Sequence, residues 1–260
     1  MRGIVGLWTA MTADEHGTEG DEPAGAPGAE DATPARPRRK LPPRRPDQLP
    51  RGRHGLSDAE VEASQRARIL DAMKALAGER GYHDASIADV IKRAGVTRKA
   101  FYKLFEDKEQ CFIQAYERDL ARLLTLTLEA FETQDEWADR VRAALSALLH
   151  ALARDPTAAR LCFIEVVTAG PRAIAARNEA MRGFTIVFDT GRLEDDRSRP
   201  PALALNMVGG MSEIIHREIA SGRAEDLPNI LPDLMYTSVL PILGPEAAER
   251  ELERGAPGGG

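Results

Sequence analysis

The stretch from Ser86 to Lys108, SIADVIKRAGVTRKAFYKLFEDK, constrains the fold more than any other part of the chain. Its first half places apolar residues on one face of a helix, at Ile87, Val90, Ile91 and Ala94. Ser86, followed three residues later by Asp89, is typical of a capped helix start. Gly95 suits the left-handed residue that ends such a helix, and Thr97 can cap a second helix. The pattern predicts a helix-turn-helix.

The second predicted helix has one apolar face and one basic face. Its inward positions are Val96, Ala100, Phe101 and Leu104. Its outward positions all carry hydrogen-bond donors, at Thr97, Arg98, Lys99, Tyr102 and Lys103. Arg and Lys bind guanine edges and phosphates, and hydroxyl groups reach phosphate oxygens. We therefore expect this helix to enter the DNA major groove. The alternative is a solvated basic helix in an ordinary helical bundle.

The whole motif, S-I-x-D-V-x-x-x-A-G-V-T-x-x-x-F-Y-x-x-F-x-x-K, resembles the N-terminal domain of the tetracycline-repressor (TetR) family of transcriptional regulators. A weaker resemblance extends over about residues 56 to 244 and does not include residues 1 to 50. It implies that Phe101 and Tyr102 end the recognition helix and that Lys108 opens the next helix with a phosphate contact. We expect base reading by Thr97, Arg98 and Lys99. We expect phosphate contacts from Ser86, Tyr102, Lys103 and Lys108.

Charge is distributed unevenly along the chain. The whole sequence is acidic, with 35 Lys and Arg against 41 Asp and Glu. Residues 36–108 carry 18 Lys and Arg against 10 Asp and Glu, whereas the remainder carries 17 against 31. A basic block of net charge +8 on a remainder of net charge −14 indicates a DNA-binding head on a body that avoids DNA.

The segment before the motif has two compositions. Residues 1–34 are rich in Gly, Ala, Pro, Asp and Glu, so we expect disorder there. Residues 36–53 place eight Lys or Arg among prolines, which predicts a flexible cationic arm. Arg51 and Arg53 either reach into the minor groove or belong to a solvated linker that adds only non-specific attraction. The sequence leaves open whether Met1 or Met11 is the true start.

Helical periodicity continues through the rest of the chain, and we see no alternating strand pattern, so we expect an all-α fold. The expected helices cover 57–80, the two helices of the motif, a long helix from Asp107, and the segments 137–154, 157–168, 171–188, 201–221 and 227–243. We assign a disordered extension to 1–56, a three-helix DNA-binding domain to 57–106 with its motif at 86–105, a larger helical domain for ligand binding and dimerisation to 107–244, and a tail to 245–260.

The last two long predicted helices have apolar faces that can serve in dimerisation. The resemblance implies that they pair with their copies across a two-fold axis, and the alternative is burial within one chain. The apolar positions are Leu203, Met207, Gly210, Met211, Ile214 and Ile215 on one helix, and Leu231, Leu234, Met235, Val239 and Ile242 on the other. We expect a homodimer, because two recognition helices double the contact with a palindrome.

Catalytic and metal-binding motifs are missing from the sequence, so we expect neither an enzyme nor a cofactor. Glu213 and His216 form a single Glu-x-x-His, which is half of a di-metal pattern and is more typical of a helix-surface pair. Cys111 and Cys162 lie in apolar patterns and indicate reduced core residues, with a redox sensor as the alternative. Because no run approaches the about 20 apolar residues of a membrane span, we expect a cytoplasmic protein.

The C-terminal half then remains as a chamber for a ligand. The resemblance implies a small, largely apolar effector of unknown identity, and the candidate wall residues are Phe131, His150, Phe163, Asn206 and Met207. His150 can equally be a satisfied core group. We expect a DNA-binding transcriptional regulator, a repressor released from a palindromic operator by its effector. The alternatives are a helical ligand carrier or enzyme, or a DNA-binding activator or architectural protein.

Overall fold

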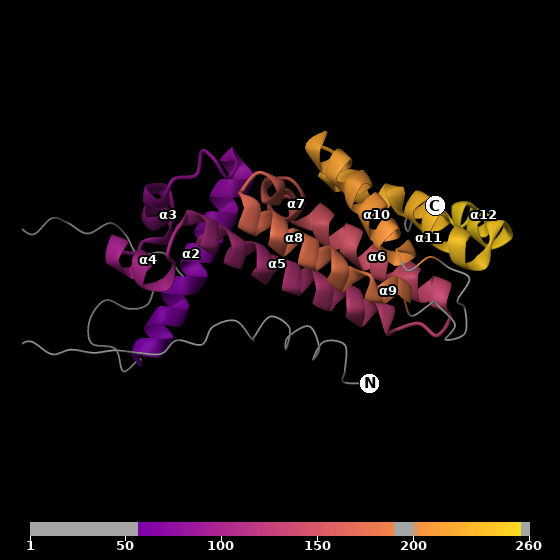
Figure 1. Cartoon of the computed structure of the whole chain (residues 1–260), viewed down its shortest axis with the longest axis horizontal. Coiled ribbons are helices and arrows are strands. Elements are labelled where there is room, and N and C mark those ends of the chain that lie inside the picture. Colours follow the sequence, from indigo (N-terminus) through magenta and orange to yellow (C-terminus); the bar gives the residue numbers. More distant parts are fainter. Residues whose placement is uncertain (1–56, 190–199, 201, 256–260) are drawn as a thin grey trace, which may run out of the picture. The chain divides into compact units, whose positions relative to one another are not determined.

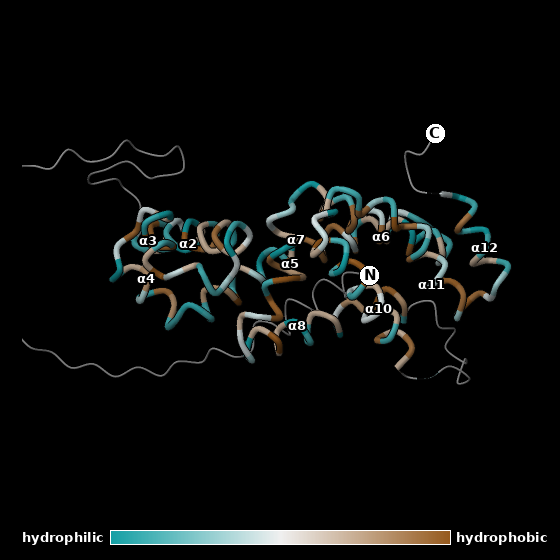
Figure 2. Tube along the Cα trace, turned by 90° about the horizontal axis from the view of Figure 1, so that it is seen from above, coloured by the Kyte–Doolittle hydropathy of each residue, from teal (hydrophilic) through white to brown (hydrophobic). Residues whose placement is uncertain are grey.

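The computed structural model describes residues 57–189, 200 and 202–255. The expected disordered extension and the basic arm with Arg51 and Arg53 lie outside the described residues. Every regular element in the described part is a helix, which confirms the all-α prediction. Figure 2 shows hydrophobic and hydrophilic positions alternating along these helices, as amphipathic packing requires.

The first three helices form a small head, which we define as residues 57–106. They are α2 (Asp58–Arg80), α3 (Ile87–Ala94) and α4 (Arg98–Leu104). Two of them begin with a capping box: Ser57 Oγ accepts from the Glu60 N–H at 3.3 Å, and Ser86 Oγ accepts from the Asp89 N–H at 3.1 Å. The predicted helix-turn-helix is therefore present with its expected start at Ser86.

The turn between α3 and α4 follows the predicted chemistry. Gly95 adopts φ 64° and ψ 37°, the left-handed conformation that a side chain disfavours. Thr97 caps α4, because its Oγ1 accepts a hydrogen bond of 3.1 Å from the Ala100 N–H. Phe101 of α4 is fully buried, together with Ile69 and Met73 of α2. Burial of the apolar face fixes α4 on the head and leaves its other face in solvent.

The body, residues 107–255, begins with two long helices, α5 (Lys108–Phe131) and α6 (Trp137–Arg154), which pack against each other (Figure 1). The remaining elements are α7 (Pro156–Phe163), η1 (Glu165–Val167), α8 (Pro171–Phe184), α9 (Ile186–Asp189), α10 (Leu203–Ala220), η2 (Ala224–Ile230), α11 (Leu231–Leu243) and α12 (Pro245–Glu253). Residues 245–253, which the sequence analysis placed in the tail, form a helix that packs on α11 and buries Ala248 and Glu251.

Head and body belong to one compact unit that begins at Ser57, and α2 makes the main contacts between them. The Lys74 ammonium binds Asp119 of α5 at 2.6 Å and Asp155, the N-cap of α7, at 2.7 Å. Farther along α2, a Cβ on Gly78 would lie 2.6 Å from Cγ2 of Thr157, so the two helices approach closely there. The contacts tie α2 to both α5 and α7.

Candidate nucleic-acid interface and ligand cavity

The outward face of α4 carries the predicted base-reading residues in a solvent-exposed array. Thr97, Arg98 and Lys99 are all exposed, and they occupy the N-cap and the first turn of the helix. Tyr102, one turn later, is 45% exposed, and the Arg98 guanidinium carbon lies 5.4 Å from the centroid of its ring. The N-terminal turn of a recognition helix is the part that contacts base edges. The geometry therefore presents these side chains where such contacts are made.

Lys103 lies on the exposed side of α4 but is ion-paired within the head. Its ammonium contacts the carboxylate of Glu62 on α2, and both side chains remain accessible to solvent. An accessible pair of this kind is weak, because water screens the two charges. Lys103 can exchange Glu62 for a phosphate oxygen, and the carboxylate then competes with the phosphate for the same ammonium.

Ser86 is exposed at the start of α3, but its hydroxyl is already in use. It donates to Asp89 Oδ2 at 2.6 Å and accepts from the Asp89 N–H. The hydrogen bonds to Ser86 hold the pKa of the Asp89 carboxyl below its usual range. A phosphate at this position would meet the positive end of the α3 dipole together with the ionised Asp89.

Lys108 opens α5, as predicted, and its ammonium points back to the loop between α2 and α3. It donates to the Tyr82 carbonyl at 2.9 Å and the His83 carbonyl at 3.4 Å, and lies 4.1 Å from the centroid of the Tyr82 ring. Burial lowers the pKa of this ammonium, and the charge of Asp84 opposes that effect. Lys108 therefore supports the loop whether or not it also contacts a phosphate.

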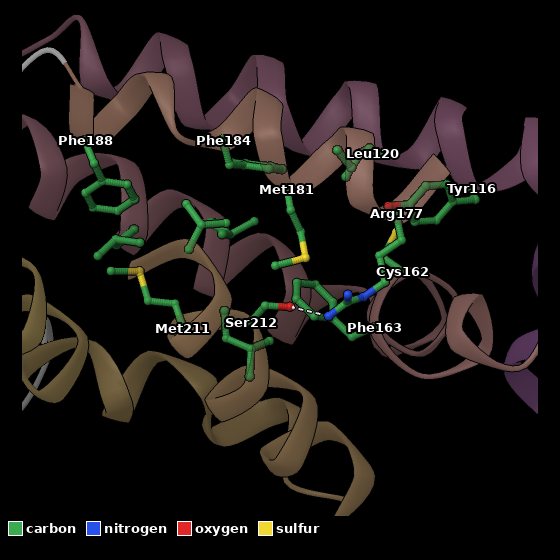
Figure 3. A pocket seen from close by; sticks show the side chains of 15 residues that line it. Tyr116, Leu120, Cys162, Phe163, Arg177, Met181, Phe184, Phe188, Met211 and Ser212 are labelled. Carbon is green, nitrogen blue, oxygen red and sulfur yellow. Dashed lines mark hydrogen bonds between the residues drawn. The ribbon is translucent and has the colours of Figure 1, made fainter. Parts of the chain in front are cut away.

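An apolar cavity lies within the body and has a volume of about 80 Å³ (Figure 3). Its walls come from α5, α6, α7, α8, α9 and α10, which are far apart in the sequence. The lining residues are Tyr116, Leu120, Leu145, Leu148, Cys162, Phe163, Arg177, Ala180, Met181, Phe184, Phe188, Val208, Met211, Ser212 and Ile215. Such a chamber, largely apolar with few polar groups, is the common form of a small-molecule site.

Polar groups in this cavity gather around Arg177 of α8. Its Nη2 donates to Ser212 Oγ of α10 at 3.3 Å, and it makes no ion pair within the part of the chain that the structure describes. Burial raises the pKa of the Tyr116 hydroxyl, and the positive charge of Arg177 acts in the opposite direction. Burial also raises the pKa of the Cys162 thiol, so this cysteine is a thiol at neutral pH.

The five predicted wall residues are dispersed, and Phe163 is the member that lines this cavity. Phe131 is buried at the end of α5, where its ring centroid lies 4.3 Å from the Arg140 guanidinium carbon. His150 Nδ1 lies 2.8 Å from the Ser146 carbonyl oxygen, within α6 itself. Asn206 is exposed, and Met207 is buried outside the lining.

Arg177 was not among the predicted site residues, although the sequence contained a signal for it. Ala180, Met181 and Phe184 follow at three, four and seven residues, which places them on the same face of α8 as Arg177. A cation within an apolar helical stripe is unusual, because burying a charge without a partner is costly. That conflict between charge and apolar surroundings marks Arg177 as a candidate ligand contact.

Metal and membrane patterns are missing from the described residues. They contain no group of His, Cys, Asp and Glu arranged to hold a metal ion, and no helix there is long and apolar enough to cross a membrane. Glu213 is exposed, whereas His216 Nδ1 lies 2.8 Å from the Phe163 carbonyl oxygen. The Glu-x-x-His pair therefore separates into a surface group and a contact between α10 and the end of α7.

Comparison with known proteins bears on this arrangement. Residues 69–115, which include the second half of α2, all of α3 and α4, and the start of α5, match the family model for "Bacterial regulatory proteins, tetR family". This match identifies residues 69–115 as a TetR-type DNA-binding region. The resemblance at the Ser86–Lys108 motif is thereby confirmed, and the chain is a DNA-binding regulator of transcription. Two proteins that it resembles are named as a transcriptional activator, FasR, and as a fatty acid degradation regulator, FadR.

Among curated relatives, the HTH-type transcriptional activator FasR of Mycolicibacterium smegmatis is 27% identical over 167 residues, which cover 62% of this chain and 76% of FasR. The FadR structure of Bacillus subtilis in complex with stearoyl-CoA is 20% identical, with a TM-score of 0.58, and the match covers 68% of this chain and 98% of that one. FadR of Bacillus halodurans gives a TM-score of 0.59 at 17% identity and covers 67% and 94%. At these identities the solved structures show a shared fold.

Proposed function

We propose that this TetR-family regulator binds a palindromic operator as a homodimer and releases it when a small organic effector occupies the body cavity. The observation that carries the proposal is that α7 lines the cavity and holds the head, while α8 lines the cavity and holds the start of α5, the helix that follows α4. We assign the DNA-binding domain to 57–106 and the domain for effector binding and dimerisation to 107–244.

Operator recognition is assigned to the exposed face of α4. Thr97, Arg98 and Lys99 read bases, and Tyr102, Lys103 and Ser86 position the helix on phosphates. Lys108 belongs to the phosphate set because its ammonium lies at the loop beside α3, although two carbonyls already hold it. Arg51 and Arg53 precede the described residues, and their role in the minor groove stays part of the proposal.

Transmission of ligand binding to the head through α7 is supported by contacts at both ends of this helix. Cys162 and Phe163, at its C-terminal end, line the cavity, and two residues later Glu165 accepts a hydrogen bond of 2.8 Å from the Tyr82 N–H in the head. At the N-terminal end, Asp155 binds Lys74 of α2. A ligand that displaces Phe163 therefore moves an element that is attached to the head on both sides.

Transmission of ligand binding to the DNA-binding helix through α8 is supported by contacts between the first turn of α8 and the start of α5. Arg177 lines the cavity, and five residues before it Arg172 donates from Nη1 to Asp107 Oδ2 at 3.0 Å, while the Arg172 N–H donates to Glu109. Asp107 is the N-cap of α5, the helix that follows α4. The effector releases DNA only by the difference between its affinities for the two conformations of the protein.

Dimerisation through α10 and α11 is supported by apolar side chains that are left in solvent. Leu205 of α10 is 44% exposed, and Leu240 and Leu243 of α11 are 38% and 53% exposed. Gly210 is exposed too, and a Cβ built on it meets nothing within 4 Å, so a partner helix can approach there. A second copy would cover these leucines and space two α4 helices along a palindrome.

An apolar effector is supported by the comparisons as well as by the cavity. One FadR structure of matching fold contains stearoyl-CoA, and one curated relative of 22% identity over 122 residues is the fatty acid metabolism regulator protein of Bacillus subtilis. FasR, in contrast, is named an activator. Repression follows from where the operator lies relative to a promoter, so identification of the operator comes first.

The test is fluorescence-anisotropy binding of the purified protein to a pool of short duplexes with competitor DNA, at two salt concentrations. We expect selection of one palindromic sequence. Lys99→Ala should then relax the sequence preference, whereas Lys108→Ala should weaken binding to all sequences about equally. Salt-dependent binding without any preferred sequence contradicts a site-specific regulator, and so does a protein that stays monomeric on its selected DNA.

A further inference from the structure

Among the described residues, the Arg177 guanidinium has no counter-ion, although it lines an apolar chamber. Arg177 is half-buried on α8 and lines the cavity. It offers five N–H donors, and its one hydrogen bond in the described part of the chain goes to Ser212 Oγ, at 3.3 Å. Because a partly desolvated charge is costly without a partner, the cavity is electrostatically incomplete as it stands.

The polar groups lie away from the Phe188 side of the cavity. Figure 3 shows Arg177 and Tyr116 toward one side, Ser212 near the middle with its hydrogen bond to Arg177, and Phe188 and Met211 toward the other side. The Tyr116 side chain is almost fully buried, and its hydroxyl makes no hydrogen bond to any described residue. A ligand that fits this arrangement has an anionic, hydrogen-bond-accepting head and an apolar body.

We infer that the cavity binds an aliphatic monocarboxylate, with its carboxylate on Arg177 and Ser212 and its chain directed toward Phe184 and Phe188. The inference rests on the proposed function, in which this cavity is the effector site. Arg suits a carboxylate because its planar donors can hold both oxygens at once. The Ser212 and Tyr116 hydroxyls supply further donors to the same head group.

A single negative charge is favoured over several. Arg177 is the one charged side chain among the described residues that line the cavity. A phosphate ester or a diphosphate inside it would leave charge unneutralised, and a neutral molecule would leave the guanidinium without a partner. The cavity therefore selects a monoanion over a nucleotide-linked thioester and over an alcohol of equal length.

The present size of the cavity indicates that such a ligand moves its walls. A cavity of about 80 Å³ is well below the roughly 300 Å³ at which small-molecule pockets begin, so a ten-carbon chain needs more room than it offers. Met181 and Met211 line the space, and the flexible methionine side chain adapts readily to a new shape. Entry of the chain thus displaces side chains of α8 and α10, the change that the proposed release of DNA requires.

Isothermal titration of the full chain with sodium octanoate, decanoate and dodecanoate, in the absence of DNA, tests the inference. At least one acid should bind, and Arg177→Met should weaken that binding at least tenfold, with partial recovery in Arg177→Lys. 1-Decanol should bind the unaltered protein at least tenfold more weakly than decanoate and should be indifferent to Arg177→Met. Arg182→Met, an exposed arginine on the same helix, is the matched control and should leave binding unchanged.

Several results would overturn the inference. One is that none of the three acids binds, and another is that decanol binds as tightly as decanoate. The others are that Arg177→Met binds decanoate as tightly as the unaltered protein does, and that decanoyl-CoA binds tightly whereas decanoate does not bind. Circular dichroism and operator binding of each variant establish that it is folded. A different molecule that releases DNA from both the unaltered protein and Arg177→Met would sustain the proposed regulator and reject the carboxylate. Decanoate that binds through Arg177 without affecting operator affinity would sustain the carboxylate site and reject its role as the effector site.

Discussion

Glu165 of η1 accepts a hydrogen bond of 2.8 Å from the backbone N–H of Tyr82, which lies just after α2. The same carboxylate accepts from Arg160 Nη2 at 2.9 Å and is buried. Gly81 permits this approach: it adopts φ 87°, and a Cβ there would lie 3.4 Å from Glu165 Oε2. A charged acceptor from the body thus fixes the end of the first helix of the head.

Replacing Glu165 with glutamine should lower the free energy of unfolding by about 2 kcal/mol, within the range for losing a charged hydrogen-bond partner in a buried place. The amide retains one acceptor but turns a donor toward either Arg160 or Tyr82. Urea unfolding measures the loss, and hydrogen exchange at the Tyr82 amide should become faster. Glu249→Gln, on the exposed side of α12, is the charge-matched control. Equal stability of the two variants would show that this contact is not structural.

Lys74→Met should destabilise the protein by about 2 to 3 kcal/mol near neutral pH, because it removes the closer cation of the buried Asp119, which keeps Arg118 at 3.5 Å, and the cation that binds Asp155 at the joint. The Asp119 side chain is 7% exposed, whereas that of Asp155 is 37% exposed and contributes less. Thermal unfolding provides the measurement. Lys92→Met, an exposed lysine on α3, should change the midpoint little.

The same cluster predicts how stability depends on pH. Burial would raise the pKa of Asp155, but hydrogen bonds from Lys74 and from the Ala158 N–H outweigh it and hold the pKa below its usual range. Its contribution is therefore complete above about pH 4, the ordinary aspartate pKa, and is lost as pH falls through the lowered value. Lys74 has a raised pKa, so its contribution is lost only above about pH 10. A plot of the free energy of unfolding of Lys74→Met against pH should therefore be flatter than that of the unaltered protein in both the acidic and the alkaline range.

Gly78→Ala tests the close approach of α2 and α7. Alanine is the better helix former by about 1 kcal/mol, yet we expect a net loss of about 1 to 3 kcal/mol, because its Cβ would lie 2.6 Å from Thr157 Cγ2. Thr157→Ser removes that methyl group and should restore part of the loss in the double variant, which makes the two changes non-additive. Additive effects in urea unfolding would mean that the helices separate instead.

Glu62→Gln should increase affinity for DNA by a few fold, because it releases the Lys103 ammonium from its pair with Glu62. The slope of log affinity against log salt should steepen by up to about 1, the value for one additional phosphate contact. Anisotropy titrations at several salt concentrations measure both quantities. Glu129→Gln on α5 changes the net charge equally at an exposed position and is the control. An identical salt slope in both variants would remove Lys103 from the DNA interface.

The head was the part most open to prediction from sequence, because its determinants are local. Ser86 with Asp89, Gly95 and Thr97 each act within a few residues, and each appears in the structure as expected. The long segments of the body were also placed correctly. Element ends were less accurate: the predicted segment 227–243 divides at Leu231 into η2 and α11.

The cavity was harder to predict, since it depends on which faces of distant helices meet. Tyr116, Arg177 and Ser212 are separated by 61 and 35 positions in the sequence, and no periodicity within one helix pairs them. Met207 and Phe163 share apolar character, yet one lies outside the lining and the other inside it. Packing between helices decides such placement. Arg177, a cation with no ion pair among the described residues, was a local sign of the site.

The buried cysteines have a practical consequence for following motion in solution. Burial raises the pKa of Cys111 to about 12, and it raises that of Cys162 as well, so neither thiol reacts with a labelling reagent until its surroundings open. Cys162 lines the cavity, whereas Cys111 lies near the start of α5 outside it. The labelling rate of Cys162 therefore reports on the cavity, and the labelling rate of Cys111 serves as an internal reference. A molecule bound in the cavity should slow the labelling of Cys162 and leave that of Cys111 unchanged.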